Sequence, residues 1–527
     1  MKRKIIFPII IVVIAAMGNN SCYKDEGNYD YKELPLFYVD TTGIYNQSSI
    51  TMRQFEQVNI TPNLVFEGDK TKIQHHWFIY SSSGNNIAQP IPGHENAPTL
   101  SMTMMNPPGS YRIEYNAFDP VSGRQAMMRW SVAVEGALGN GWLVYYSKNG
   151  LVDCDLIKTN LIVADQNEEI ILRGIYSQAN PNSPITKEPR FIGHLSSSAT
   201  RSWINLMYEG GGVRVSSDDM AITKEFDQLT YEPFGTPNPE GYRVRHGQNS
   251  DNTSGTELFV NNGGLYHNNT GNGGSDPIFS FATMWDGSPT YIAPHAFEVW
   301  GSNVLAYDQL NMCFVWKTLW SGMMRVVSSS APNPVFDFSN VGKKMIYADW
   351  GYNPTALGGT TPIVIYSIFK NPVDNGERYI YSMCMYGQVA TAVDNTTLAV
   401  MDLTGAPEVA DAELFAFALR GPVAYYAGTS TVYRILFNPE GVSTPTVQSG
   451  WTAPNGETIT SMKFIVHPGV GLSERADYKY LFVSTWNGTE GKVYMLESNV
   501  SNGVLAAEPV AVFTGFGRIK DMCYKIR

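Results

Sequence analysis

Cysteine is scarce in this 527-residue sequence, and the few cysteines follow no pattern. Four of the five lie far apart without CxxC spacing, which argues against a disulfide framework and against a cysteine-based metal site. These four are Cys154, Cys313, Cys384 and Cys523. We expect their thiols to be buried and to pack as small hydrophobic side chains. Whether Cys154 and Cys523 pair, if the fold closes on itself, stays open.

Positive charge is also in short supply. Lys and Arg total 37 against 48 Asp and Glu, so the formal net charge is −11. An acidic chain of this kind lacks the basic footprint that nucleic-acid binding needs. We therefore expect no nucleic-acid partner.

Sequence motifs for catalysis, metals and cofactors are absent as well. The 8 histidines never form HExxH or another close metal-ligand arrangement. The sequence has no G-x-S-x-G elbow, no phosphate-binding Gly-Lys-Ser/Thr loop and no D-x-D-x-D-G calcium loop. It thus predicts no catalytic residues, no metal site and no cofactor. Acids far apart in sequence can still meet in a fold, so an enzyme stays open as an alternative.

Long hydrophobic runs are missing too. The longest, Ile5–Met17, has 13 residues. At 1.5 Å per residue it falls short of a hydrocarbon core about 30 Å thick, so it does not predict a transmembrane helix. Lys-Arg-Lys at residues 2–4 precedes this run, and Ser21 stands directly before Cys22. Basic, apolar and small-residue zones in this order predict a secretory signal peptide at residues 1–21.

This leader resembles bacterial lipoprotein signals, although Asn19 stands where leucine is usual. The resemblance implies that Cys22 is lipidated and becomes the first residue of the mature chain. Lys24-Asp25-Glu26 resembles the short acidic tag that sends lipoproteins of Bacteroidota to the outer face of the outer membrane. Residues 22–31 would then be a lipidated tether, and the protein would be anchored in the outer membrane facing the cell exterior.

Glycine, proline and aromatic residues, by contrast, are abundant. The chain has 48 Gly, 30 Pro and 12% aromatics, which suits many short strands and tight turns and predicts an all-β protein. Residues 32–135 alternate short strands with turn clusters, which indicates a β-sandwich. The strand Gly109–Asp119, G-S-Y-R-I-E-Y-N-A-F-D, resembles a strand of PKD-type immunoglobulin-like domains. Trp77 would then pack between the sheets.

A second domain is predicted at residues 138–527, after a glycine-rich joint. Strand, turn and strand recur there, with Tyr381, Tyr433 and Tyr494 at steps of 52 and 61 residues. Steps of this size are typical of four-stranded blades with loops, so we predict a β-propeller of about seven blades. An elongated stack of β-sandwiches is the alternative.

The last strand, Ile519–Tyr524, has no hairpin partner after it. Such a strand can complete the first blade and close a propeller ring. We therefore expect it to pair with strands near Trp142–Tyr146.

Taken together, four features resemble the PKD-like lipoprotein family of Bacteroidota. These are the leader, the run C-Y-K-D-E-G-N-Y-D-Y after it, the sandwich followed by G-W-L-V-Y, and the ending G-F-G-R-I-K-D-M. The resemblance implies a place beside a Sus-type TonB-dependent transporter and its lipoprotein lid. It therefore implies a non-enzymatic surface protein that captures nutrients, which we take to be oligopeptides. A surface glycan-binding protein of a polysaccharide utilisation system is the first alternative, and a propeller hydrolase or lyase is the second.

Aromatic residues in loops are the candidate binding residues. Trp285, Trp350 and Tyr352 lie among Gly, Asp and Pro residues typical of turns. Exposed rings of this kind can stack on sugars or on peptide groups. We expect these three residues to bind the ligand or the transporter from one face, although they could instead plug blade edges. Trp486 lies closer to a predicted strand, so we expect it in the core.

Overall fold

The computed structural model describes most of the chain between residues 35 and 526. The described residues are 35–42, 49–82, 87–163, 166, 168–198, 201–231, 235–245, 256–269, 278–299, 303–328, 333–352, 363–385, 395–439, 441–464, 479–499 and 501–526. The predicted signal peptide, Cys22 and the tether lie outside them. The chain forms two compact units, one built from residues up to 50, 58–101 and 110–132, the other from 51–57, 102–109 and 133 onward.

The described residues of the first unit have the predicted sandwich character and form three sheets. The five-stranded sheet has the order β2 (Ser49–Arg53), β9 (Arg124–Glu135), β8 (Gly109–Asp119), β5 (Gln74–Ser81) and β6 (Gln89–Pro90). The two smaller sheets pair β1 (Phe37–Val39) with β4 (Leu64–Phe66), and β3 (Gln57–Ile60) with β7 (Leu100–Thr103).

Trp77 forms the centre of the sandwich core, as predicted. Its side chain is buried and its ring lies 4.8 Å from Tyr115 and 5.9 Å from Trp130. The indole N–H donates to the carbonyl oxygen of Ala97 at 2.8 Å, so the polar atom of this large ring is satisfied.

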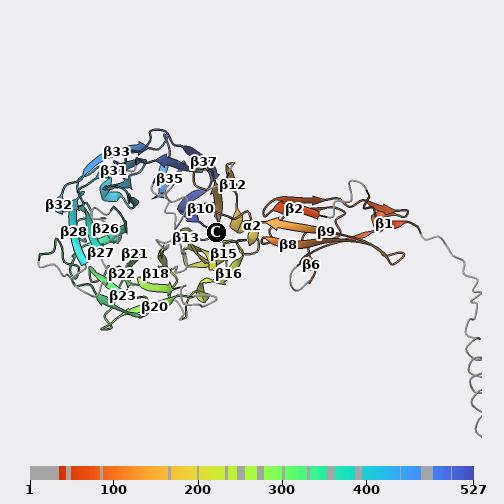
Figure 1. The fold of residues 1–527 in the computed structure, drawn as a ribbon, viewed down its shortest axis with the longest axis horizontal. Helices are drawn as coiled ribbons and strands as arrows, with labels where there is room; N and C mark the ends of the chain where they lie inside the picture. Colours follow the sequence, from red (N-terminus) through yellow and green to blue (C-terminus); the bar gives the residue numbers. More distant parts are fainter. Residues whose placement is uncertain are drawn as a thin grey trace, which may run out of the picture. The chain divides into compact units, whose positions relative to one another are not determined.

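The second unit is a β-propeller in which the described residues form seven four-stranded blades (Figure 1). Written from the innermost strand outward, the first three are β38 (Arg518–Lys525), β10 (Gly141–Lys148), β11 (Leu151–Lys158), β12 (Ile170–Leu172); β13 (Pro189–Ser198), β14 (Arg201–Tyr208), β15 (Gly211–Ser216), β16 (Ile222–Glu225); and β17 (Pro239–Arg245), β18 (Thr256–Asn261), β19 (Gly264–Asn269), β20 (Ser280–Met284).

The remaining four blades follow in chain order. They are β21 (Ile292–Val299), β22 (Asn303–Asp308), β23 (Cys313–Thr318), β24 (Met323–Val326); β25 (Lys344–Trp350), β26 (Ile363–Lys370), β27 (Arg378–Met385), β28 (Asn395–Asp402); β29 (Phe415–Phe417), β30 (Val423–Ala427), β31 (Thr431–Leu436), β33 (Thr446–Thr452); and β34 (Thr458–Phe464), β35 (Tyr480–Trp486), β36 (Gly491–Glu497), β37 (Ala511–Phe516). Blades three and four join through parallel pairing of β20 with β24, and β32 (Gly441–Ser443) adds to β28 in the same way.

The ring closes as predicted. Strand β38 pairs antiparallel with β10, with Trp142 opposite Tyr524 and Tyr146 opposite Ile519. The innermost strands neighbour one another in the order β38, β13, β17, β21, β25, β29, β34 and back to β38. The elongated stack of sandwiches is therefore wrong, because a stack would leave the two ends of this series apart.

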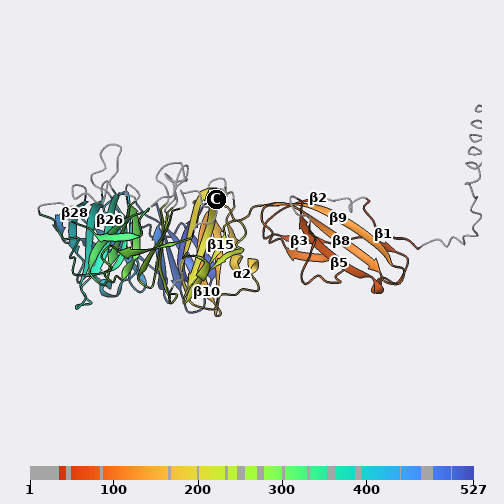
Figure 2. The same ribbon diagram turned by 90° about the horizontal axis from the view of Figure 1, so that it is seen from below.

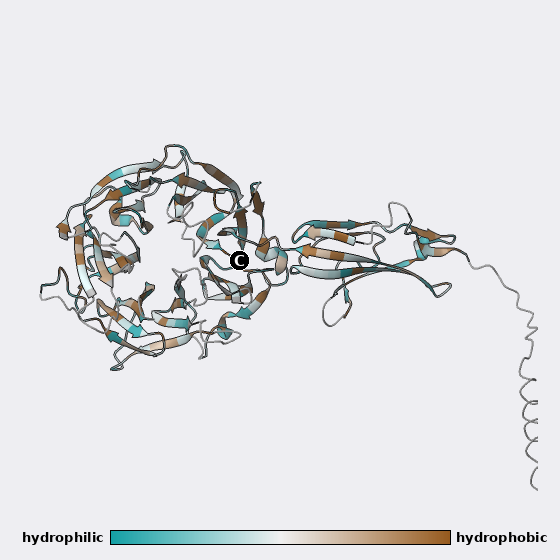
Figure 3. Cartoon of the chain, viewed as in Figure 1, coloured by the Kyte–Doolittle hydropathy of each residue, from teal (hydrophilic) through white to brown (hydrophobic). Residues whose placement is uncertain are grey.

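Most of the propeller core lies between neighbouring blades. Strands such as β10, β18 and β22 are buried at nearly every position, so both faces of each blade are covered. Hydrophobic residues accordingly recur along the strands of every blade (Figure 3). The Trp142 ring, for example, stacks on Phe482 of the seventh blade at 4.3 Å.

The four described cysteines are free, so Cys154 and Cys523 do not pair. Cys154 and Cys523 lie on the two strands that flank β10, opposite Tyr145 and Leu143 respectively. Burial raises the pKa of the Cys523 thiol to about 12 and that of Cys154 well above its usual value. Cys154 is buried in a core cluster and the half-buried Cys523 packs against it, as expected of thiols that act as small hydrophobic side chains.

Each blade has two ends, one on either side of the ring (Figure 2). At one end, short turns join the second strand of each blade to its third, and the innermost strands begin there. We call this end the turn face. Because successive strands are antiparallel, the innermost strand of each blade runs away from the turn face and the outermost strand runs toward it.

Candidate functional site

A pocket of about 440 Å³ opens on the turn face where the ring closes. It lies between the first blade, the segment that leads into the second blade, and the seventh blade. Its lining residues are Ser147, Lys148, Asn149, Gly150, Val152, Thr186, Lys187, Glu188, Trp486, Gly488, Thr489 and Arg518. We call it the seam pocket, because the first and last strands of the propeller meet there.

Two glycines allow the backbones around the seam pocket to approach closely. A Cβ atom on Gly517 would lie 2.1 Å from the carbonyl oxygen of Ser147, and one on Gly491 would lie 1.9 Å from the carbonyl oxygen of Gly517. Contacts under 3 Å with backbone leave no room for a side chain. Glycine at both positions therefore allows the β10–β38 strand pair of the first blade to approach the seventh blade closely.

The turn between β10 and β11 forms one wall of the pocket. Asn149 and Gly150 both have positive φ, 54° and 77°, between the paired residues Lys148 and Leu151. Asn-Gly is the preferred sequence for a two-residue turn of this kind, since its twist matches that of the strands. The tight turn fixes the backbone position of Lys148. The Lys148 ammonium donates to the carbonyl oxygen of Gly515 at 2.9 Å.

Positive charge predominates in the seam pocket. Lys148, Lys187 and Arg518 line it, with Glu188 as the one carboxylate among its lining residues. The lining of the pocket is therefore positively charged, whereas the whole chain has a net charge of −11. A pocket of this charge attracts anionic groups.

Trp486 lies at the wall of the pocket, so the expectation that it belongs to the core is wrong. It is the last residue of β35, and its ring is half-buried. The residue opposite it on β36 is Gly491, which has no side chain to cover the indole. Thr458 donates its hydroxyl to the Trp486 carbonyl oxygen at 3.2 Å, which fixes the backbone there.

Trp285 is exposed, as predicted, with 65% of its surface accessible. It directly follows β20, an outermost strand, and therefore lies on the turn face. The Arg325 guanidinium lies 4.6 Å from the centre of its ring, a cation–π contact that leaves most of the indole open.

Trp350 and Tyr352 lie elsewhere. Trp350 is the last residue of β25 and not a turn residue, and it packs half-buried in the core cluster that contains Phe297. The half-buried Tyr352 accepts a hydrogen bond at its carbonyl oxygen from the hydroxyl of Tyr366, at 2.6 Å. Because β25 is an innermost strand, both residues lie at the end opposite the turn face. The prediction that these two residues share one face with Trp285 is therefore wrong.

A second polar cluster, between blades two and three, was missed at the sequence level. Glu257 on β18 accepts hydrogen bonds from Trp203, Asn205, Tyr242 and Asn268 at 2.6–2.9 Å and pairs with Arg214 at 3.2 Å. Arg214 and Glu257 are almost fully buried. Side chains from both blades converge on Glu257, so this cluster joins blades two and three.

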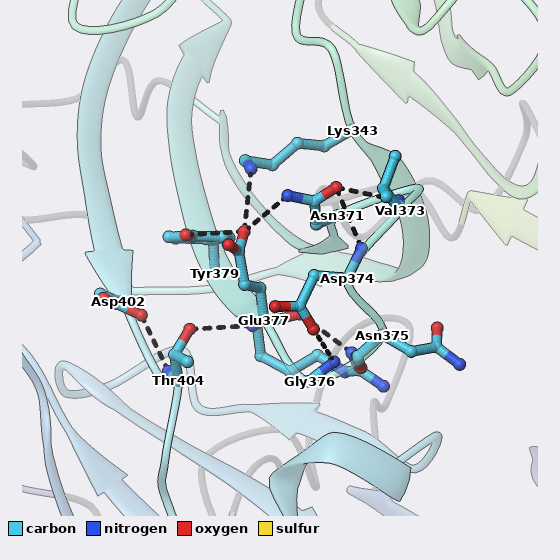
Figure 4. A network of polar contacts seen from close by, with 11 residues as sticks. Lys343, Asn371, Val373, Asp374, Asn375, Gly376, Glu377, Tyr379, Asp402 and Thr404 are labelled. Atoms are coloured by element: carbon cyan, nitrogen blue, oxygen red, sulfur yellow. Dashed lines mark hydrogen bonds and ion pairs between the residues drawn. The ribbon is translucent and has the colours of Figure 1, made fainter.

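The turn between β26 and β27 carries a third cluster, centred on Glu377 (Figure 4). Its carboxylate accepts from Asn371 and Tyr379, both at 3.0 Å, and pairs with Lys343 at 3.6 Å. The hydrogen bond from Asn371, above all, lowers the pKa of Glu377. The carboxylate is thus engaged in holding its own turn.

Within the described ranges, no group of three or more His, Cys, Asp or Glu residues is placed to hold a metal ion. Likewise, none of the helices described there has the length and apolar character needed to span a membrane.

Part of the chain matches one known protein family. Residues 22–189 match the PKD-like family, a stretch that contains the sandwich and continues through β10, β11 and β12. The other six blades lie beyond that stretch, except for the first residue of β13. No curated protein matches the chain.

Several solved structures are similar over most of the chain. One is a quinonprotein alcohol dehydrogenase-like protein from Bacteroides thetaiotaomicron, with a TM-score of 0.43 and 10% identity over 92% of this chain and 99% of that one. Another is a putative 6-phosphogluconolactonase from Bacteroides uniformis, with 0.28 and 10% over 84% and 100%. A third is YCF48 from Cyanidioschyzon merolae, with 0.33 and 11% over 72% and 98%. The seven-bladed architecture given above rests on the strand pairing itself.

Proposed function

We propose that this protein is a lipid-anchored propeller at the outer surface of the outer membrane that captures oligopeptides for a Sus-type TonB-dependent transporter. The observation that carries the proposal is the seam pocket. It is open to solvent, and it places the Trp486 ring beside cationic groups and a carboxylate. Pockets that bind small ligands combine a flat apolar surface with a few convergent polar groups in this way.

Capture without turnover fits the lining residues better than hydrolysis does. Glycoside hydrolysis by the usual route needs two carboxyl groups on either side of the bond that is cleaved. The residues that line the seam pocket include only Glu188. Trp486, the cations and Glu188 can hold a peptide, but they do not form an acid–base pair.

The anchor and the partner rest on other support. The leader with Cys22 and the following Lys24-Asp25-Glu26 support a lipid anchor at the cell surface. The match of residues 22–189 to the PKD-like family supports the relationship on which the transporter and its lipoprotein lid are proposed.

A soluble form that begins at residue 23 tests the proposal. We expect it to bind peptides from a casein digest, to leave them uncleaved, and to lose most of this binding in Trp486→Ala. Trp320→Ala is the matched control, because Trp320 is 65% exposed and does not line the pocket. Equal binding by wild type and Trp486→Ala would remove the seam pocket from the proposal, and cleavage of the peptides would replace capture with catalysis.

Glycan binding is the second candidate, since an exposed indole also stacks on sugar rings. A panel of polysaccharides in the same assay separates the two. Binding to a polysaccharide and not to the digest, with the same loss in Trp486→Ala, would identify a glycan-binding protein.

A further inference from the structure

Two cations of the seam pocket are available to a ligand. Lys148 is held by the carbonyl oxygen of Gly515. Lys187 and Arg518 are exposed, and neither side chain has a hydrogen bond or ion pair with another residue in the part of the chain that the structure describes. Their donors therefore face solvent, with no acceptor among the residues that the structure describes.

Arg518 is fixed at its base, although its head is free. It is the first residue of β38 and pairs with Ser147 on β10. Gly517 precedes it at a point where the backbones touch. Arginine held in this way presents a planar fork of donors that matches the two oxygens of a carboxylate.

The size and the remaining lining residues indicate what accompanies that carboxylate. A volume of about 440 Å³ is near the small end of the range for ligand pockets, roughly 300–1,000 Å³, so the pocket suits the end of a chain and not a long middle segment. Trp486 offers a flat surface for an apolar side chain or a peptide plane. Glu188 can accept one N–H group.

On the proposed function of peptide capture, we propose that the seam pocket recognises the C-terminal carboxylate of a peptide. Arg518 binds the carboxylate through two N–H groups, and Lys187 adds charge beside it. The last side chain of the peptide packs on Trp486, and Glu188 accepts from a peptide N–H. The pocket thus selects peptide ends, which proteolysis produces in number, over internal segments.

A pair of acetylated pentapeptides tests this directly. Ac-Gly-Ala-Ser-Ala-Phe is prepared as the free acid and as the amide, and binding to the soluble chain from residue 23 is measured by calorimetry. We expect the acid to bind at least tenfold more tightly than the amide, and the ratio to shrink as NaCl is raised. Arg518→Gln should bring the ratio near one without changing the melting temperature. Lys479→Gln, which removes an exposed cation of the neighbouring seventh blade that does not line the pocket, should preserve it.

The outcomes separate the inference from the proposed function. Equal binding of acid and amide would overturn carboxylate recognition and leave peptide capture standing, and so would a preference that survives in Arg518→Gln. If neither peptide binds but the casein digest does, recognition of the peptide end is overturned and peptide capture still stands. Tighter binding of an oligogalacturonate than of the peptide acid, lost in Arg518→Gln, would show that the carboxylate belongs to a sugar and would overturn both.

Discussion

Arg214 and Glu257 form an ion pair of 3.2 Å inside the propeller, although they belong to different blades and lie 43 residues apart. The guanidinium also lies 4.5 Å from the ring of Trp203, which itself donates to Glu257. Burying two charges is costly, and the hydrogen bonds to Asn205, Tyr242 and Asn268 offset part of that cost. Blades two and three are therefore held together by a polar contact as well as by apolar packing.

Removing one partner of this pair should be severe. We expect Glu257→Ala to lower the free energy of unfolding by roughly 3–5 kcal/mol, because Arg214 would remain buried without its counter-charge. Urea unfolding followed by tryptophan fluorescence measures the loss. Glu497→Ala is the control, since the Lys479–Glu497 pair is about 40% exposed and such pairs contribute at most about 1 kcal/mol. Similar losses in both variants would mean that the buried pair has no special role.

The closing strand should be indispensable. A chain that ends at Gly517 lacks β38, which leaves β10 with an unpaired edge and opens the core that contains Trp142 and Phe482. Since domains are stable by only about 5–15 kcal/mol, this chain should be insoluble or unfolded. Circular dichroism and gel filtration provide the measurement, with deletion of Arg527 alone as the control. A truncated chain that melts like the full-length protein would make β38 a mere appendage.

His295 should make the propeller less stable in acid. Burial, together with the positive charge of Arg243, lowers its pKa from about 6.5 to about 4, against the smaller opposing effects of the Ile346 carbonyl and Asp349. Between these two values the unfolded chain binds a proton that the folded chain does not. Stability is therefore full above about pH 6.5 and falls as the pH drops toward 4, by at most about 3 kcal/mol from this group.

The difference between wild type and His295→Gln isolates that contribution. Unfolding free energies measured at intervals from pH 7.5 to pH 4.5 should converge as the pH falls, because the variant has no imidazole to protonate. Parallel curves for the two proteins would contradict the lowered pKa.

The two candidate tryptophans should respond differently to replacement. Trp350→Ala removes a ring from the core cluster and should cost roughly 2–3 kcal/mol, below the range for a fully buried tryptophan. Trp285→Ala removes a ring that is 65% exposed and should cost less than about 1 kcal/mol. Thermal melts of both variants give the comparison. A steep loss in Trp285→Ala would show that it plugs a blade edge, and its proposed role in binding a partner would then be untenable.

Lipidation of Cys22 is open to a direct test. In cells fed a clickable fatty acid, the wild-type protein should be labelled and should sediment with membranes, whereas Cys22→Ala should be unlabelled and released. Protease treatment of intact cells should digest the wild type, because the protein is predicted to face the exterior. Label that persists in Cys22→Ala would place the acyl group elsewhere, and resistance to protease would contradict the surface location.

The sequence predicted those parts of the fold that depend on local pattern. Alternation along β9, R-Q-A-M-M-R-W-S-V-A-V-E, matches its strictly alternating burial, and the lone last strand indicated the closed ring. The candidate site depends on which strands lie opposite each other although they are far apart in the sequence. Trp486 reaches the surface because Gly491 faces it, and no local pattern around Trp486 contains that information.

The same limit explains the placement of Trp350. Gly351 and the residues after it look like a turn, but the strand before them extends to Trp350 itself and is an innermost strand. Which end of the propeller a residue occupies follows from counting strands within a blade. A shift of one strand in that count moves a side chain to the opposite face, so the three aromatic residues could not be assigned a common face from sequence.

The pairing of β10 with β38 also dictates the order in which the protein can be completed. The indole N–H of Trp142 and the sulfur of Met522, 3.3 Å apart, are separated by 380 residues. The first blade therefore lacks its innermost strand until β38 has been made, and contacts this distant in sequence form slowly. The ring can thus close only once β38 has been made, and until then β10 keeps one edge without a partner strand.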